Sequence, residues 1–176
     1  INNCNSDGAN LNTIKTNIQK SVNKHLIADV PVSCFLSGGI DSTIIAYEAQ
    51  KYLKKISTYT VGFKDSMDHQ DIKYSRIAAK FIGSDHNEII VDKIDMEEFI
   101  NLIEYFDEPF ADTAILANYI VSKEVSKSSK VALSGDGADE FFYGNRAYND
   151  IYNKSKKRWL NINQDLMSKN IFLKNG

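Results

Sequence analysis

Short apolar stretches alternate with longer amphipathic patterns along most of this chain, and this alternation limits the folds open to it. The short stretches, rich in valine, isoleucine, threonine or tyrosine, predict β-strands at 30–36, 56–63, 88–91 and 130–133. Elsewhere apolar residues recur every three or four positions, which predicts helices at 11–26, 41–53, 71–81, 96–106 and 113–125, with a short helix from 138. We expect Pro31 to end the first helix, since proline disfavours helical geometry in the residue before it. The order of elements predicts an α/β fold, a Rossmann-like parallel sheet with helices on both faces.

The composition is that of an ordinary soluble globular domain. Of the 176 residues, 43% are hydrophobic and 25% are charged, which allows one domain with a buried core. The formal charge of −2 gives no electrostatic reason to expect a nucleic-acid or membrane partner, and no apolar run approaches the roughly 20 residues that span a bilayer. Cys4 lies in a polar leader and Cys34 in an apolar run, so we expect a reducing compartment, the cytoplasm, and a small buried thiol at Cys34. The histidines lack metal-ligand spacing and are expected on the surface or in packing; they are His25, His69 and His86.

The two ends suggest a piece of a longer protein. The chain begins with Ile1, and its last residues, 174–176, close no recognisable element. We expect 1–10 to be a polar leader, 11–148 to be the core, and 149–176 to begin a further helical part.

The turn after the first predicted strand has the composition of an anion site. Residues 37–42, Ser-Gly-Gly-Ile-Asp-Ser, lie between a strand and a helix. The glycines let backbone amides approach a ligand, and the helix start adds unpaired amides and a partial positive charge, which together suit phosphate. No lysine follows the glycines, so this is not a Walker A loop. Asp41 beside a phosphate calls for a bridging cation such as Mg²⁺; alternatively, Asp41 only caps the helix and the glycines only form a tight turn.

A second glycine turn follows the fourth predicted strand. Residues 134–140, Ser-Gly-Asp-Gly-Ala-Asp-Glu, place Asp136, Asp139 and Glu140 beside two glycines, and such crowding is costly without a cation or hydrogen bonds. The simpler alternative is a helix start that carries acids, which the helix dipole favours. In parallel α/β sheets, ligands bind beyond the carboxyl ends of the strands, so both turns are expected at one edge of the sheet. There Asp41 and Asp139 could hold one Mg²⁺ between them.

Five segments resemble the asparagine synthetase family in their order and spacing. They are 29–32 (Asp-Val-Pro-Val), 35–42 (Phe-Leu-Ser-Gly-Gly-Ile-Asp-Ser), 60–63 (Thr-Val-Gly-Phe), 106–112 (Phe-Asp-Glu-Pro-Phe-Ala-Asp) and 133–140 (Leu-Ser-Gly-Asp-Gly-Ala-Asp-Glu). The resemblance covers roughly 11–148. It implies the family's C-terminal synthetase domain, a pyrophosphate-loop ATP pyrophosphatase with an adenine nucleotide α-hydrolase-like fold.

The resemblance implies a ligase of the glutamine-hydrolysing asparagine synthase type that uses ATP and Mg²⁺. Such an enzyme activates a carboxylate, here expected to be that of aspartate, as an acyl-adenylate and releases pyrophosphate. Ammonia from glutamine, supplied by a separate glutaminase domain, then displaces AMP and forms the amide. The expected partners are therefore ATP, a small carboxylic acid and that domain, with a homodimer left open. Tyr143 stands where the family usually has glycine, which leaves the acceptor acid open, and we expect little catalysis from this piece alone.

The resemblance also assigns roles by matching position. The residues that match pyrophosphate-binding positions are Ser37, Gly38, Gly39 and Ser42. The residues that match adenosine contacts are Phe35, Val61, Ser134 and Gly135. Asp41 belongs both to the ATP-binding set and to the Mg²⁺ ligands, the second of which is Asp139. Asp136 matches an acidic position tied to forming and using the acyl-adenylate, and is the expected catalytic residue.

Other functions stay open from the sequence alone. One is a truncated paralogue that binds a nucleotide without catalysis, and another is a related amidotransferase acting on a different acid. A third is a sulfur-transfer or tRNA-modifying ATP pyrophosphatase, which would be expected to show catalytic cysteines or a basic face. Cys4 and Cys34 are poorly placed for that chemistry, and the net charge is slightly negative.

Overall fold

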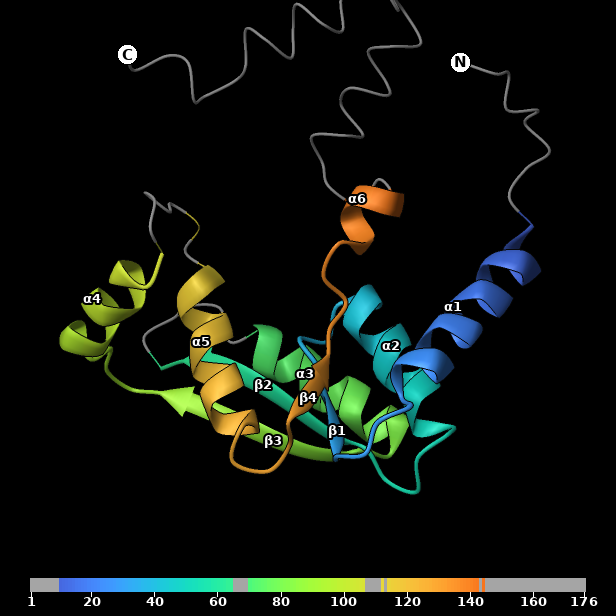
Figure 1. Cartoon of the computed structure of the whole chain (residues 1–176), viewed down its shortest axis with the longest axis horizontal. Coiled ribbons are helices and arrows are strands. Elements are labelled where there is room, and N and C mark those ends of the chain that lie inside the picture. The colour runs from blue at the N-terminus through green and yellow to red at the C-terminus, as the bar shows by residue number, and fades with distance from the viewer. Residues whose placement is uncertain (1–9, 65–69, 107–111, 113, 143, 145–176) are drawn as a thin grey trace, which may run out of the picture. The chain divides into compact units, whose positions relative to one another are not determined.

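The computed structural model describes residues 10–64, 70–106, 112, 114–142 and 144 (Figure 1). The chain divides into two compact units, Ile1–Gly135 and Asp136–Gly176. The first unit contains the sheet and helices α1 to α5, and the described part of the second contains helix α6, Ala138–Phe142. Residues 1–9 of the expected leader (1–10) and the expected helical part over 149–176 lie outside the described residues, and Asn10 is the N-cap of α1.

Four strands of the first unit form one parallel sheet. They are β1 (Val32–Phe35), β2 (Ser57–Phe63), β3 (Asp85–Val91) and β4 (Val131–Leu133), in the order β3-β2-β1-β4. The predicted parallel sheet is confirmed. β3 begins earlier than the predicted start at 88, because its first residues are polar and gave no apolar signal although they pair with β2.

The predicted helices are also present in the first unit. They are α1 (Leu11–His25), α2 (Ile40–Gln50), α3 (Gln70–Ile82), α4 (Met96–Glu104) and α5 (Ala114–Val125). Among the described residues, no helix has the length and apolarity that a bilayer crossing needs.

Helix α1 ends earlier than predicted. Leu26 is its C-cap, so Pro31 does not end the helix. Residues 27–30 follow the helix and are all exposed, so the apolar stripe on the core ends at Leu26. Pro31 instead precedes β1, which begins at Val32, because proline has no N–H for the strand ladder.

The two faces of the sheet bury separate apolar clusters. Cys34 and Leu36 point to the face covered by α1, α2 and α3, where they pack in the larger cluster. Phe35, between them in the chain, points to the other face and packs beside Tyr59 and Val121, the latter from α5. This alternation follows from the pleat of a strand and confirms the prediction of helices on both faces.

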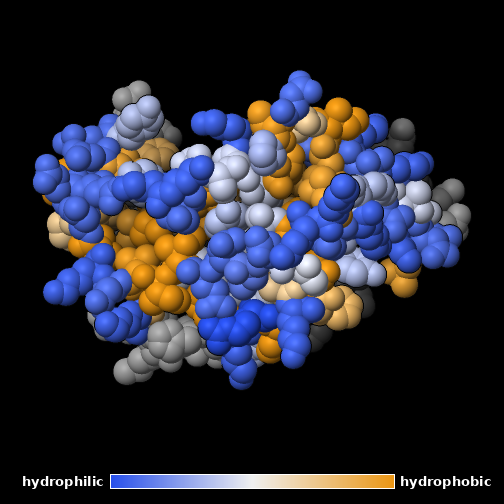
Figure 2. Space-filling view, turned by 90° about the horizontal axis from the view of Figure 1, so that it is seen from below, coloured by the Kyte–Doolittle hydropathy of each residue, from blue (hydrophilic) through white to orange (hydrophobic). Residues whose placement is uncertain are grey.

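Other large apolar side chains remain at the surface. Figure 2 shows apolar patches between hydrophilic side chains on one face of the molecule. On helix α4, for example, the side chains of Met96, Ile100 and Ile103 are exposed. The buried core therefore lies mainly along the sheet and under α1, α2, α3 and α5.

Candidate functional site

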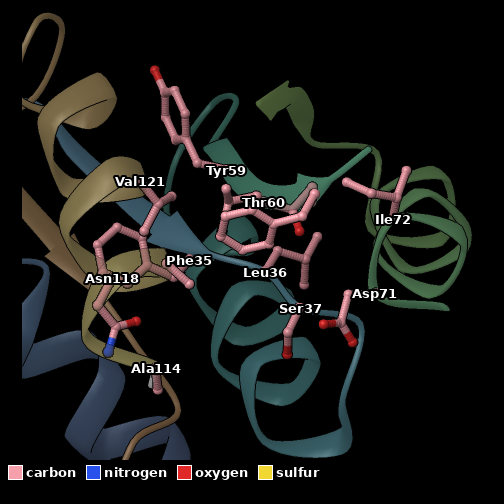
Figure 3. A pocket seen from close by; sticks show the side chains of 14 residues that line it. Phe35, Leu36, Ser37, Tyr59, Thr60, Asp71, Ile72, Ala114, Asn118 and Val121 are labelled. Atoms are coloured by element: carbon pink, nitrogen blue, oxygen red, sulfur yellow. The ribbon is translucent and has the colours of Figure 1, made fainter. Parts of the chain in front are cut away.

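A cleft of about 350 Å³ opens where β1 and β2 end (Figure 3). Its walls come from the ends of these two strands, the first turn of α3 and one side of α5. This is the edge of a parallel α/β sheet at which ligands bind. Phe35, Ser37 and Val61, three of the residues predicted to contact ATP, line this cleft together.

The cleft has an apolar wall and a polar end. Phe35 and Val121 line one side with their apolar side chains, whereas Figure 3 shows the oxygen atoms of Ser37 and Asp71 on another side of the cavity. An apolar slot of this kind suits a flat aromatic group, and the polar end suits a group that makes hydrogen bonds.

Hydroxyl groups hold the turn after β1 in shape. The Ser37 and Ser42 hydroxyls lie 3.1 Å apart, and the Ser42 hydroxyl donates to the Gly39 carbonyl at 3.3 Å. The Gly39 N–H donates to the Ser37 hydroxyl at 3.3 Å. The N-cap of α2 is Gly39, which has no side chain to cap the helix, so Asp41 lies inside the first turn and is not the N-cap. The turn therefore presents amides and hydroxyls at a helix start, a combination that suits an anion.

The turns after β1 and β4 touch each other. A Cβ atom added to Gly135 would lie 2.7 Å from the backbone nitrogen of Ser42 and 2.9 Å from the carbonyl carbon of Asp41. No side chain fits in that space, so only glycine allows this approach. The contact brings Gly135, half-buried Ser134 and the Asp41–Ser42 backbone to one edge of the sheet.

Helix α3 is fixed against the same edge. Gly38 has a φ of +82°, and a Cβ atom there would lie 2.3 Å from the carbonyl carbon of Tyr74. A Cβ atom on Gly62, near the end of β2, would lie 2.6 Å from a side-chain carbon of Ile72. These two contacts set the start of α3 at the cleft, where Asp71 joins the lining.

Two polar residues of the cleft escaped the sequence analysis. Asp71 lies in the first turn of α3, where an acid is common because the helix dipole favours it, and Asn118 lies within α5. Neither stands next to a glycine turn in the sequence. Only the packing of α3 and α5 around the sheet brings them to the site.

Asp136 and Asp139 belong to the second unit. Both side chains are exposed, and Asp139 is in the first turn of α6. Within this unit the N–H of Gly144 donates to the Asp139 carbonyl at 3.1 Å. The catalytic role of Asp136 and the Mg²⁺ role of Asp139 stay predictions.

The described groups with clearly shifted pKa values do not line the cleft. Cys34 is buried as predicted, and burial raises the pKa of its thiol to about 12. Burial lowers the pKa of His86, whose Nδ1 lies 2.9 Å from the Thr58 hydroxyl, so this histidine packs at the sheet. His25 is exposed, and His69 lies outside the described residues. Within the part of the chain that the structure describes, no three His, Cys, Asp or Glu side chains form a group that could hold a metal.

Several curated proteins are similar to this chain. Asparagine synthetase (glutamine-hydrolyzing) 1 of Bacillus subtilis is 37% identical over 138 residues, which cover 78% of this chain and 22% of that protein. A putative asparagine synthetase (glutamine-hydrolyzing) of Mycobacterium tuberculosis is 38% identical over 149 residues, covering 82% and 22%. The asparagine synthetase of Cricetulus griseus is 31% identical over 152 residues, covering 78% and 27%. The chain therefore spans 22–27% of the length of these curated relatives.

Solved structures show a similar fold. The NH3-dependent NAD synthetase of Campylobacter jejuni matches 77% of this chain and 61% of its own chain with a TM-score of 0.52 and 13% identity. The NMN synthetase of Francisella tularensis matches 77% and 58% with a TM-score of 0.52 and 19% identity. Together with the parallel sheet, the likeness confirms the predicted Rossmann-like α/β fold.

A family model gives the wider relationship. The model described as asparagine synthase matches residues 13–174, nearly the whole chain. It includes both glycine turns, whose backbones meet at Gly135 and Ser42. This chain therefore belongs to the asparagine synthase family.

Proposed function

We propose that this chain is the nucleotide-binding part of an ATP-dependent ligase that activates a carboxylate and forms an amide. The observation that carries the proposal is the contact of Gly135 with the Asp41–Ser42 backbone. This contact brings two turns that contain hydroxyl residues and glycine together at one edge of the sheet, next to a cleft with an apolar wall. A nucleotide requires both features, a slot for its base and amides for its phosphates.

The proposed pose follows the chemistry of the cleft. The base of ATP lies against Phe35 and Val61, and the β- and γ-phosphates lie on the turn after β1, where Ser37 and Ser42 donate hydroxyls. Ser134 and Gly135 complete the adenosine contacts, while Gly38 and Gly39 leave the amides of the turn open to the phosphates.

Asp41 and Asp139 are the proposed Mg²⁺ ligands. Asp41 fits this role because it lies in the first turn of α2, next in sequence to Ser42, whose hydroxyl contacts that of Ser37, and because Mg²⁺ prefers oxygen ligands. When bound, Mg²⁺ would neutralise charge on the departing pyrophosphate. The turn amides of this chain would stabilise the same charge. Asp136 would accept the proton that ammonia loses as it attacks the acyl-adenylate and displaces AMP.

The proposed substrates are aspartate, ATP and ammonia derived from glutamine. The names of the relatives, asparagine synthetases described as glutamine-hydrolyzing, support this choice. Because the chain spans only 22–27% of their length, we propose that a glutaminase domain of the whole protein supplies the ammonia.

A pyrophosphate-release assay on the whole gene product tests the reaction. Release that depends on aspartate and yields asparagine supports the proposal. Release that depends on a different acid would replace asparagine synthesis by a related amidotransferase reaction, and ATP binding without any release would favour the truncated paralogue.

Binding of Mg·ATP to the Asp41→Ala variant tests the proposed metal ligand. We expect the affinity to fall at least about tenfold, since a divalent ion bridging to phosphate would lose one of its oxygen ligands. Glu97→Ala is a matched control, because Glu97 is also the second residue of a helix, α4, and is exposed away from the cleft. Equal affinities of the Asp41→Ala variant and wild type would remove the role proposed for Asp41.

A further inference from the structure

Asp71 contributes a carboxylate to the cleft that the proposed nucleotide pose does not use. It is the second residue of α3 (Gln70–Ile82) and lines the same cavity as Phe35 and Ser37. Figure 3 shows its carboxylate directed toward the region of the Ser37 hydroxyl. The side chain is exposed and faces the cavity as well as bulk solvent.

The surrounding backbone fixes Asp71 at this position. Ile72 packs so closely on Gly62 that a Cβ atom on the glycine would lie 2.6 Å from the isoleucine side chain. Two residues further along α3, Tyr74 approaches Gly38 with equally little room. Because α3 touches both strand ends through these contacts, the helix backbone at Asp71 is held at the rim of the cleft.

Asp71 also keeps its hydrogen-bonding capacity. Within the described part of the chain it makes no hydrogen bond and no ion pair, whereas acids on neighbouring helices are paired, as in Glu98 with Lys123 and Glu124 with Lys127. An ionised carboxylate only accepts hydrogen bonds, so its natural ligand partner is a hydroxyl or an amine. A phosphate oxygen in contact with it would be repelled.

Charge and position together select the group that Asp71 meets. With the base at Phe35 and Val61 and the phosphates at the turn of Ser37, the part of the nucleotide between them is the sugar, whose hydroxyls are donors. We infer that Asp71 binds a ribose hydroxyl of the nucleotide and thereby distinguishes ATP from the analogue that lacks this hydroxyl. This inference rests on the proposed function, because it needs a nucleotide in the cleft.

A thermodynamic cycle with deoxynucleotides tests this role. The full chain and its Asp71→Ala variant are titrated by calorimetry with the Mg²⁺ complexes of ATP, 2′-deoxy-ATP and 3′-deoxy-ATP. We expect wild type to bind one deoxy analogue about tenfold more weakly than ATP, the size of a lost hydrogen bond to a charged group. The Asp71→Ala variant should bind ATP as weakly as wild type binds that analogue, and should no longer distinguish the two ligands.

Two further variants separate recognition from folding. Asp71→Asn keeps an acceptor oxygen and should retain part of the discrimination, and Glu97→Ala, at the equivalent position of α4, should bind all three ligands as wild type does. If wild type binds ATP but Asp71→Ala weakens the three ligands equally, the ribose role is wrong and the proposed function stands. If wild type binds no ATP, both proposals are overturned.

Discussion

Gly38 meets two separate demands at one position. Its φ of +82° is unfavourable for other residues, and a Cβ atom would lie 2.3 Å from backbone of Tyr74. Gly83 has a similar φ of +76°, but nothing lies within 4 Å of its added Cβ atom. Substituting each glycine in turn therefore separates the energetic cost of a left-handed backbone from the cost of a steric clash.

We expect Gly38→Ala to lower the free energy of unfolding by about 3 kcal/mol or more, and Gly83→Ala by about 1 kcal/mol. The smaller loss reflects the left-handed backbone alone, and the difference reflects the clash with α3. Urea unfolding followed by circular dichroism measures both. Equal losses would mean that the loop can move away from α3 at little cost.

Cys34 should be chemically inert in the folded chain. Its thiol is buried, and burial raises its pKa to about 12 from the usual 9.0, so almost no thiolate exists at pH 8. Since the unfolded thiol ionises first, the stability due to this group holds below pH 9 and is lost as the pH rises toward 12. In a Cys4→Ser background, iodoacetamide should label Cys34 only after denaturant is added; rapid labelling of the native chain would contradict this.

At the scale of elements, the approach of the two turns depends on Gly135. No positive φ is recorded there, so alanine is acceptable to the backbone, and only the contact with Ser42 and Asp41 excludes it. We expect Gly135→Ala to weaken Mg·ATP binding at least about tenfold, because one turn must shift by more than a few tenths of an ångström. Gly83→Ala is the control in the same titration, because nothing lies within 4 Å of the Cβ atom added there. Unchanged binding by the Gly135→Ala variant would show that the turns act independently.

The elements that could be predicted from the sequence were those with a local signal. Apolar strands such as 130–133 and the stripe from Leu11 to Leu26 carry their own periodicity, and glycine beside hydroxyl residues marks a turn. The polar start of β3 had no such signal, because it is held by its pairing with β2. Asp71 was missed for a related reason, since its place in the cleft depends on contacts of Gly38 and Gly62 with α3.

Across the first unit, the inner strand β1 joins distant parts of the chain. β1 pairs with β2 on one side and with β4 on the other, and the buried hydroxyls of Ser33 and Ser129, 96 residues apart in sequence, are in contact. A version ending at residue 126 would leave one edge of β1 unpaired and would expose Cys34 beside it. We expect that version to bind a hydrophobic dye and to lose cooperative urea unfolding; a sharp transition equal to that of the full chain would contradict this.

The place of β1 in the sheet also has a consequence for biosynthesis. Ribosomes add about 5–20 residues each second, so β1 leaves the ribosome roughly 5–20 seconds before β4, with which it pairs. During that interval a nascent chain carries an open strand edge next to an apolar surface, the kind of surface that chaperones bind. Slow codons placed before residue 131 would prolong this interval and raise the fraction of chains lost to aggregation.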